Sequence, residues 1–392
     1  MNILVINYEY PPIGGGGGVI CRDISEEIAS KGHRVTVITS LFDGLLPYES
    51  INRVGIHRVP VLMRSKRDVA SLPSMLSYVP RCVRKGAELL RAQRFDVINT
   101  HFAVPSGPAG HHLSGRFRVP NVLTIHGGDI FDPTKTLSPH RTFGLKQTVR
   151  MMLEGADRVV AQSSDTRNNS RIYYGVDRHI DIIPLGIRQN PYPVKTRKEL
   201  DLPDAGWLFV TIGRIVRRKN IPDLLEVFAE LRKEIPCTLL VIGDGPEMGA
   251  LKRKIQEMNI GESVRMTGRV DEERKFQYLC AADLYLSTAL HEGFGIVFLE
   301  AMECGLPIVC YDRGGQTDFL KEGETGSLVR LGDREGFKKQ MIDLLISDQK
   351  RRRIKAYNRQ YVKEFYISRC ADRYLEIFDS ASSFRKGGNV VI

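Results

Sequence analysis

The stretch HEGFGIVFLEAMECGLPIV, residues 291–309, decides the fold class of this 392-residue chain. A short apolar strand at 284–287 precedes it, and its glycine-rich start predicts a loop that opens a helix at about Phe294. Gly305 and Pro307 end that helix, and another apolar strand begins directly afterwards. The order of strand, loop, helix and strand is typical of a parallel sheet covered by helices.

The same alternation extends in both directions from this stretch. In the C-terminal half it predicts a helix at 221–234 and strands at 207–213, 238–243, 264–267, 308–311 and 327–329. In the N-terminal half it predicts a helix at 20–31 and strands at 3–7, 34–40, 54–59, 97–100, 121–126 and 158–162. We therefore expect an α/β protein with two parallel, Rossmann-like sheets wound by helices.

Two domains fit the length of the chain, because a single core stops growing near about 250–300 residues. Between the two patterns, residues 186–204 are polar and rich in proline, which is typical of a linker. We expect an N-terminal domain over 1–188 and a C-terminal domain over 189–366. The last helix, at about 367–382, is expected to return to the first domain.

Composition excludes disordered, collagenous and coiled-coil chains, since 42% of the residues are hydrophobic and 26% are charged. The chain shows no signal-peptide pattern and no run of about 20 apolar residues that could span a bilayer. Seven cysteines have no metal-ligand spacing, so we expect a cytoplasmic protein with reduced, mostly buried thiols. The net charge of +11 favours an anionic partner.

Five glycines at 14–18 join the first predicted strand to the first predicted helix. Glycine lets the backbone approach a ligand closely, and the free amides at the start of a helix favour an anion. The run differs from the G-x-G-x-x-G dinucleotide fingerprint, because Val19 stands where its third glycine belongs. The pattern indicates a turn that contacts phosphate, with a loop that binds nothing as the alternative.

A second glycine turn, at Gly213, is followed by basic residues. Arg214 and Lys219 lie five residues apart, and both could reach one diphosphate, the arginine with its fork and the lysine as a point charge. The neighbouring Arg217 and Arg218 are expected to be solvated. A basic surface cluster is the alternative interpretation.

Glu292 and Glu300 are eight residues apart, a little over two helical turns, so we expect them on a similar side of the helix axis. A buried, ionised glutamate needs a hydrogen-bonding partner, which the vicinal hydroxyls of a sugar would supply. The free amides of residues 294–297 would meanwhile face phosphate oxygens. Spacing alone is weak support, because two glutamates on a helix usually form a solvated face.

His126 ends an apolar strand and precedes two glycines, which places it on a loop at the carboxyl edge of the first sheet. That position favours a role in ligand binding. His101, also at a strand end, and the pair His111 and His112 have no metal-ligand spacing, and we interpret them as structural.

Together these motifs resemble the retaining glycosyltransferases of family four, which have the GT-B fold of two Rossmann-like domains facing each other across a cleft. The resemblance spans nearly the whole chain and follows the family's order. Its segments are the glycine run 14–18, Thr124-Ile125-His126-Gly127-Gly128-Asp129, Ile183-Pro184-Leu185-Gly186-Ile187, Gly213-Arg214 with Lys219, Gly243-Asp244-Gly245-Pro246, the Glu292 and Glu300 helix, and Gly314-Gly315-Gln316-Thr317-Asp318. Asp318 departs from the family, which commonly has glutamate there.

The resemblance implies a metal-independent transfer of a sugar from a UDP- or GDP-linked donor to an acceptor hydroxyl, with no permanently bound cofactor. Arg214 and Lys219, after Gly213, would bind the donor diphosphate. Glu300 would hold the ribose hydroxyls, and backbone around Val270 would border the base.

The same resemblance places the transferred sugar. Glu292 would contact it together with the amides that follow, and His126 would lie near its anomeric carbon. The remaining contacts would be made by backbone, toward the sugar or the phosphates: Gly15, Gly16, Gly293, Phe294, Gly295, Ile296 and Val297. A non-hydrolysing sugar-nucleotide epimerase and a sugar phosphorylase share this architecture and stay open as alternatives.

The excess of basic residues has two interpretations. A nucleic-acid-binding protein is the remote one, because no recognition motif accompanies the charge. The other rests on residues 64–94, where basic side chains alternate with apolar ones: Arg64, Lys66, Arg67, Arg81, Arg84, Lys85, Arg91 and Arg94, with Val69, Leu72, Met75, Leu76, Val79, Val83, Leu89 and Leu90. Such a stretch either binds an anionic membrane surface or packs as an ordinary helix.

Binding to an anionic membrane surface predicts peripheral attachment at the inner face of the membrane. The acceptor would then be a lipid-linked or envelope glycan in polysaccharide, lipopolysaccharide or glycolipid synthesis, with a small molecule as the alternative.

Overall fold

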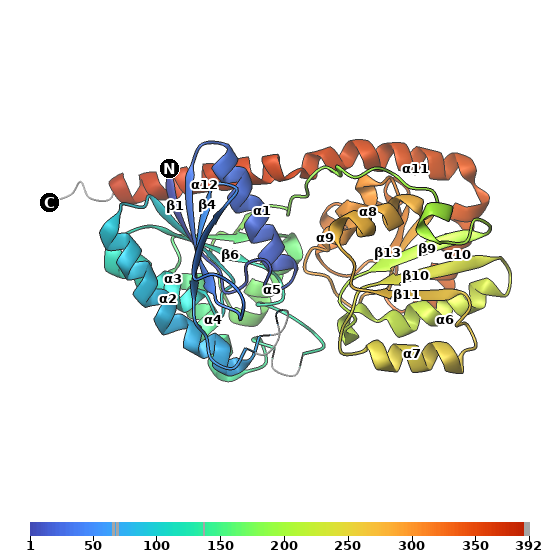
Figure 1. Ribbon diagram of the computed structural model, residues 1–392, viewed down its shortest axis with the longest axis horizontal. Helices are drawn as coiled ribbons and strands as arrows, with labels where there is room; N and C mark the ends of the chain where they lie inside the picture. Colours follow the sequence, from blue (N-terminus) through green and yellow to red (C-terminus); the bar gives the residue numbers. More distant parts are fainter. Residues whose placement is uncertain (65–66, 68–69, 136–137, 388–392) are drawn as a thin grey trace. The chain divides into compact units, whose positions relative to one another are not determined.

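The computed structural model of the chain describes residues 1–64, 67, 70–135 and 138–387, with side chains up to residue 383 (Figure 1). The chain divides into two compact units. Unit 1 comprises Met1–Arg188 and the C-terminal segment from Tyr366, and unit 2 comprises Gln189–Phe365. Each unit has its own sheet and its own core, and the α/β class predicted from the sequence is confirmed.

Unit 1 contains an eight-stranded sheet in the order β3-β4-β2-β1-β5-β6-β7-β8. All pairs are parallel except β3 with β4, which is antiparallel. The strands are β1 Asn2–Ile6, β2 Arg34–Ser40, β3 Tyr48–Ile51, β4 Val54–Val59, β5 Val97–His101, β6 Asn121–Ile125, β7 Arg158–Ala161 and β8 Asp181–Ile182. The inner strands are buried on both faces, which explains their uninterrupted apolar sequences.

Helices cover both faces of this sheet. They are α1 Gly16–Ser30, α2 Leu72–Ala92, α3 Gly107–Phe117, α4 Phe143–Gly155, α5 Ser164–Tyr174 and α12 Ile367–Gly387. Helices α2 and α3 pack on the face that carries Leu4 and Ile6. The C-terminal α12 packs against α1, β5 and β6, so this last helix belongs to unit 1 (Figure 1).

Unit 2 contains a six-stranded, fully parallel sheet in the order β11-β10-β9-β12-β13-β14. Its strands are β9 Trp207–Ile212, β10 Cys237–Ile242, β11 Val264–Gly268, β12 Leu284–Ser287, β13 Ile308–Tyr311 and β14 Gly326–Val329. Its helices are α6 Ile221–Arg232, α7 Met248–Glu257, α8 Glu272–Ala281, α9 Ile296–Glu303, α10 Arg334–Ile346 and α11 Asp348–Tyr361. Helices α8 and α9 lie side by side on one face, and α6 and α7 lie on the other (Figure 1). Four short 3₁₀ helices complete the described elements: η1 Lys198–Leu200, η2 Arg217–Lys219, η3 Gly315–Asp318 and η4 Val362–Phe365.

The strand order places one switch point in each sheet, where the chain reverses the direction in which it adds strands. The switch lies between β1 and β5 in unit 1 and between β9 and β12 in unit 2. In open α/β sheets, ligands bind beyond the carboxyl ends of the strands at such points. The loops that follow β9 and β12 contain residues 213–220 and 288–295, and these carry half of the site residues predicted from the sequence.

Two helix starts differ from the sequence prediction. Helix α1 begins at Gly16, inside the glycine run, and not near residue 20. Gly18 packs tightly there, because a Cβ atom would stand 3.1 Å from the carbonyl oxygen of Glu9. Helix α9 begins at Ile296, two residues later than expected, since Gly295 has φ +84° and cannot belong to a right-handed helix. Within the described part of the chain, no helix combines the length and the hydropathy needed to span a bilayer.

Candidate functional site

The loops after β9 and β12 meet at the switch point of unit 2. The backbone amide of Leu290 donates to the carbonyl oxygen of Arg218 across 2.9 Å, which joins the two loops directly. The loop after β13 joins them, because the amide of Gly315 donates to the carbonyl oxygen of Glu292 across 2.7 Å. Three loops from adjacent or nearby strands therefore surround Glu292.

Glu292 lies between two cations. Lys219 Nζ donates to its Oε1 across 2.5 Å, and Arg218 Nη1 donates to its Oε2 across 2.8 Å. Only 6% of the Glu292 side chain is exposed. Burial alone would raise the pKa of this carboxyl, but the charges of Arg218 and Lys219 outweigh it and hold the pKa at about 2. Glu292 is therefore ionised at neutral pH, and the cluster carries one net positive charge.

The prediction that Arg218 is solvated is wrong. Besides Glu292, its guanidinium contacts the carbonyl oxygen of His291, and only 24% of the side chain is exposed. Arg217, the neighbouring residue in η2, is exposed as expected. Arg218 therefore belongs to the candidate site, and the sequence contains no signal that separates it from Arg217.

Glu300 lies in α9 and is held by a cation that the sequence analysis missed. Lys275 Nζ, on the adjacent α8, donates to Glu300 Oε1 across 2.7 Å and also reaches Glu272. Burial lowers the pKa of Lys275, but the charges of Glu300 and Glu272 more than offset it and raise the pKa. Glu292 precedes α9 and is not on it, so the helical spacing expected for the two glutamates does not apply.

Glycines bring the backbones of these loops close together. Gly213 follows β9 with φ +152°, and a Cβ atom there would stand 2.8 Å from Cε of Lys219. Gly243 follows β10 with φ +133°, and its Cβ would stand 2.0 Å from the carbonyl oxygen of Gly213. No other residue type would let the loops after β9 and β10 approach so closely. Arg214, next to Gly213, is exposed and near the same turn.

The start of α9 supplies backbone donors. Gly295 caps the helix, and the first amides of a helix, here from Ile296 and Val297, have no intrahelical acceptor. Gly293 and Gly295 are partly exposed, whereas the ring of Phe294 is buried and packs 4.8 Å from that of Phe319. Val270, half-buried, lies in the loop between β11 and α8. The Phe294 ring thus fixes a loop whose backbone stays accessible.

In unit 1, His126 follows β6 and forms a hydrogen-bonded pair with His101 at the end of β5. Nε2 of His126 and Nδ1 of His101 are 2.9 Å apart. Asp129 fixes the turn around His126, because its carboxylate accepts the backbone amides of His126 and Ala103. Interpreting His101 as purely structural is therefore incomplete, since it is the direct partner of His126.

Asn99 determines which nitrogen atoms carry protons. Its Nδ2 donates to the carbonyl oxygen of Val122, so its Oδ1 is left to accept from Nε2 of His101 across 2.8 Å. A neutral His101 then has a lone pair on Nδ1, and His126 donates to it through Nε2–H. Burial lowers the pKa of His126 to about 4, so this ring is neutral at pH 7 with an acceptor at Nδ1.

Phe102 links His126 to the glycine run. Its ring centroid lies 4.4 Å from that of His126, and a Cβ atom on Gly17 would stand 2.4 Å from its Cζ atom. Gly15 and Gly16 lie beside this contact, and a Cβ atom on either would meet nothing within 4 Å. The amide of Gly15 donates to Glu9 Oε2 across 3.1 Å. The two sequence motifs of unit 1 therefore lie at one edge of its sheet, connected by an aromatic ring that the sequence analysis missed.

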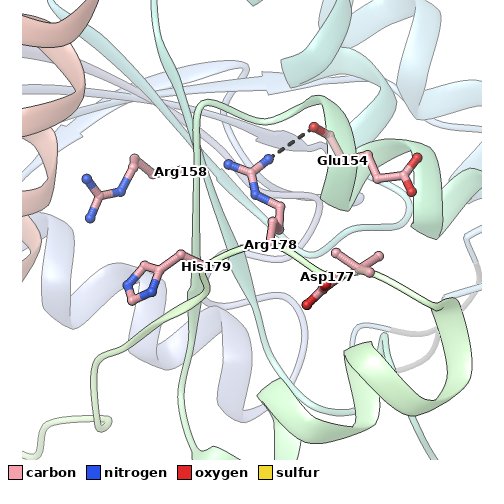
Figure 2. A pocket seen from close by; sticks show the side chains of 6 residues that line it. Glu154, Arg158, Asp177, Arg178 and His179 are labelled. Carbon is pink, nitrogen blue, oxygen red and sulfur yellow. Dashed lines mark hydrogen bonds between the residues drawn. The ribbon is translucent and has the colours of Figure 1, made fainter.

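A cavity of about 550 Å³ in unit 1 lies at the opposite edge of the sheet from His126 (Figure 2). Its basic residues are engaged in structural contacts. Arg178 donates to carbonyl oxygens at the end of α4, including that of Glu154, and Arg158 forms a two-pronged pair with Asp181. Because Arg158 begins β7, this cavity lies at the amino ends of the strands, away from the switch point.

Among the described residues, no group of three or more histidine, cysteine, aspartate or glutamate side chains is arranged to hold a metal ion. The chemical groups that the described residues offer at the candidate sites are cations, carboxylates, backbone amides and a neutral histidine pair.

Family models and solved structures define the class of the protein. Residues 14–190 match the Glycosyltransferase Family 4 model, and residues 194–361 match the model of Glycosyl transferases group 1. The chain belongs to the family-four glycosyltransferases, and its two Rossmann-like units are those of the GT-B fold. The family resemblance and the two-domain α/β fold predicted from the sequence are thus confirmed.

Three similar proteins illustrate this membership. The N-acetyl-alpha-D-glucosaminyl L-malate synthase of Bacillus anthracis is 25% identical over 397 residues, which cover 97% of this chain and 98% of that protein. The sucrose-phosphate synthase of Thermosynechococcus elongatus has a TM-score of 0.84 at 22% identity, over 97% of this chain and 98% of the other. Anabaena Alr3699/HepE, solved in complex with UDP, has a TM-score of 0.77 at 20% identity, over 97% and 100%.

Proposed function

We propose that this glycosyltransferase is a retaining enzyme that moves a sugar from a nucleoside diphosphate donor to an acceptor hydroxyl without a metal ion. The observation that carries the proposal is the cluster of the buried Glu292 with the partly exposed Lys219 and Arg218 at the switch point of unit 2. A cation there can bind a diphosphate, and a carboxylate beside it can accept hydrogen bonds from hydroxyls of the sugar. The UDP bound by the Anabaena protein supports a UDP-linked donor, with a GDP-linked donor as the second choice.

The electrostatic work of the reaction is to stabilise the departing diphosphate. Arg214 is exposed, and Lys219 can exchange its carboxylate partner for a phosphate oxygen when the donor binds. The amides at the start of α9 add partial positive charge. In this scheme Glu300 binds the ribose hydroxyls and Val270 borders the base, while Glu292 binds the transferred sugar.

Retention follows from attack on the same face of the sugar. The acceptor oxygen forms the new bond to the anomeric carbon as the bond to the diphosphate breaks, and a phosphate oxygen of the leaving group accepts the acceptor's proton. We propose that unit 1 contributes His126 to the transferred sugar and Gly15 and Gly16 to the phosphates. Because His126 is neutral, it acts as a hydrogen-bond acceptor through Nδ1 and does not supply a proton at pH 7.

The test compares single variants with a panel of UDP- and GDP-sugars. Arg214→Ala and Lys219→Ala should each lower turnover by about 10²–10³, as expected for loss of one strong donor to the developing charge. Arg217→Ala removes an exposed arginine of the same loop and should leave turnover close to that of the wild type. Near-normal turnover in both Arg214→Ala and Lys219→Ala would overturn the proposal.

Incubation with donor alone separates the alternative reactions. An epimerase would convert the donor without any acceptor. A phosphorylase would leave the nucleotide sugar unchanged even with an acceptor present, because it transfers the sugar from a sugar phosphate. The proposed transferase should leave most of the donor unchanged until an acceptor is added, because hydrolysis by water is the slower side reaction.

We also propose that α2 binds an anionic membrane surface, so that the acceptor is a lipid-linked or envelope glycan and the enzyme works at the inner face of the membrane. Tyr78 and Cys82 face the core, whereas 56% of Leu72 and 65% of Leu76 are exposed beside basic residues of the same helix. Of the basic and apolar stretch, Lys66 and Val69 lie outside the described residues.

A double variant, Leu72→Ser/Leu76→Ser, tests this surface. It should sediment less than the wild type with anionic liposomes at low salt, while neutral liposomes should retain neither the variant nor the wild type. Equal sedimentation of both proteins would count against this surface.

A further inference from the structure

Two cysteines of unit 2 lie against each other at the ends of adjacent helices. Cys280 is in the last turn of α8, and Cys304 caps the C-terminus of α9. Their Sγ atoms are 2.8 Å apart, and both residues are free thiols. The Sγ atom of Cys304 also lies 3.8 Å from the carbonyl oxygen of Phe276, one turn before Cys280. Since a disulfide bond is about 2.05 Å long, the sulfur atoms need to approach by less than about 1 Å to form one.

The surroundings of the pair divide its roles. The hydrogen bond with Cys304 outweighs burial and, with the charges of Arg359 and Lys355, lowers the pKa of Cys280. Both cations lie at the end of α9, because a Cβ atom on Gly305 would stand 2.7 Å from Cγ of Lys355 and 3.0 Å from Nε of Arg359. The same hydrogen bond raises the pKa of Cys304. Of the two thiols, Cys280 therefore loses its proton more readily and is the better nucleophile, whereas Cys304 retains its proton.

The other cysteines differ from Cys280 in exposure and in charge. All seven lie within the described residues, and Cys280 is the one that is not buried. Burial raises the pKa of the remaining thiols, to about 11 for Cys237, to about 12 for Cys21, Cys82 and Cys370, and higher still for Cys310. An oxidant that reacts preferentially with solvent-accessible thiols of low pKa should therefore react at Cys280.

We propose that Cys280 and Cys304 form a peroxide-sensitive dithiol that closes into a reversible disulfide. The Cys280 thiolate attacks one oxygen of hydrogen peroxide and the O–O bond breaks. Hydroxide departs, and Cys280 becomes a sulfenic acid. The sulfur of Cys304 then attacks the sulfenic sulfur, its proton passes to the departing hydroxyl, and water leaves as the S–S bond forms. The two sulfur atoms lose two electrons, which the peroxide gains, and a dithiol reductant restores the thiols.

The disulfide would join α8 to α9 next to the Glu300 ion pair. Lys275 lies five residues before Cys280 on α8, and Glu300 lies four residues before Cys304 on α9. The two helices would then be linked at two points about one turn apart, by the Lys275–Glu300 ion pair and by the disulfide bond. The oxidised protein should therefore melt at a higher temperature than the reduced one. This inference depends on the geometry of unit 2 alone and not on the proposed function.

The experiment exposes the folded, full-length protein to hydrogen peroxide and removes the peroxide. It then unfolds the protein in the presence of a reagent that blocks free thiols, and maps the peptides by mass spectrometry. We expect one linked peptide pair containing Cys280 and Cys304, and a fall in blocked cysteines from seven to five. Dithiothreitol should restore all seven and reverse the rise in melting temperature. Seven blocked cysteines after exposure, or a linkage that excludes Cys280 and Cys304, would overturn the proposal in the wild type.

Three variants test the order of the steps. Cys304→Ser should accumulate a sulfenic acid on Cys280 that dimedone labels, because the second thiol is missing. Cys280→Ser should form no linkage to Cys304. Cys237→Ser is the matched control, which removes a buried thiol of the same unit and should retain the Cys280–Cys304 linkage. Dimedone labelling of Cys304 in the Cys280→Ser variant at the wild-type rate of oxidation would refute the assignment of Cys280 as the reactive thiol.

Discussion

Replacing Glu292 with glutamine should remove a pH-dependent part of the stability of unit 2. In the folded protein the pKa of Glu292 is about 2, whereas an unfolded glutamate has a pKa of about 4.3. The difference corresponds to about 3 kcal/mol at about 1.4 kcal/mol per pH unit. Because the folded pKa is the lower one, this stability is present above about pH 4.3 and is lost as the pH falls toward 2. About half of it should remain at pH 3.

The assay is urea unfolding followed by tryptophan fluorescence. The chain has a single tryptophan, Trp207, which begins β9 and packs against the core of unit 2, so the signal reports the unit that contains Glu292. The variant should unfold more easily than the wild type at pH 7, and the gap between them should narrow as the pH approaches 3. The variant also leaves Lys219 and Arg218 without a carboxylate partner. That cost lowers its free energy of unfolding by the same amount at pH 7 and at pH 3, so it does not change how the gap depends on pH.

A control variant excludes a general effect of glutamate replacement. Glu230 is an exposed residue of α6 that pairs with Lys233 on the surface, so Glu230→Gln should unfold almost like the wild type at both pH values. A gap between Glu292→Gln and the wild type that is the same at pH 7 and at pH 3 would refute the reasoning. In that case the carboxylate would not be held ionised by its two cations.

Two further predictions concern a turn and a buried acid. Gly243→Ala should destabilise unit 2 by at least about 2 kcal/mol in the same fluorescence assay, since its φ is +133° and its Cβ would meet the carbonyl oxygen of Gly213. Gly249→Ala, on α7, is the control: its Cβ would make an ordinary contact 3.9 Å from Nη1 of Arg253, so this variant should be at least as stable as the wild type. Burial raises the pKa of Asp129 to about 6, so wild-type stability followed by circular dichroism should fall as the pH rises from about 4 to 6, by about 3 kcal/mol. Asp129→Asn should lack that fall, and an unchanged pH dependence in this variant would contradict the assignment.

The sequence predicts the parallel strands of both units well, because strands buried on two faces need uninterrupted apolar runs. It misses β3, whose residues Tyr48–Ile51 are mostly exposed and pair along the edge of the sheet. It also misses β8, which has two residues and is too short to show a period. Helix α3 contains three glycines and two histidines, a poor helical sequence, yet Gly110 is needed where α3 approaches Thr100. Tertiary packing overrides local preference at each of these places.

The candidate site divides in the same way between motif and packing. Lys219 and Glu292 stand in recognisable glycine-containing loops, and the structure brings them together. Lys275 stands in an ordinary charged helix, and its pairing with Glu300 depends on α8 lying beside α9. Phe102 is likewise a single aromatic residue after a strand, and its contact with His126 depends on β5 pairing with β6. These partners come from neighbouring elements and leave no pattern within their own segments.

Arg217 and Arg218 show why such partners escape a reading of the chain. In a 3₁₀ turn, consecutive side chains point about 120° apart, so two adjacent arginines must face different surroundings. The turn alone does not determine which of them faces inward. The pairing of β9 with β12 does, because it brings the loop that carries Glu292 to the side of η2 where Arg218 projects. The choice between a solvated arginine and a site arginine is therefore made by the order of strands in the sheet.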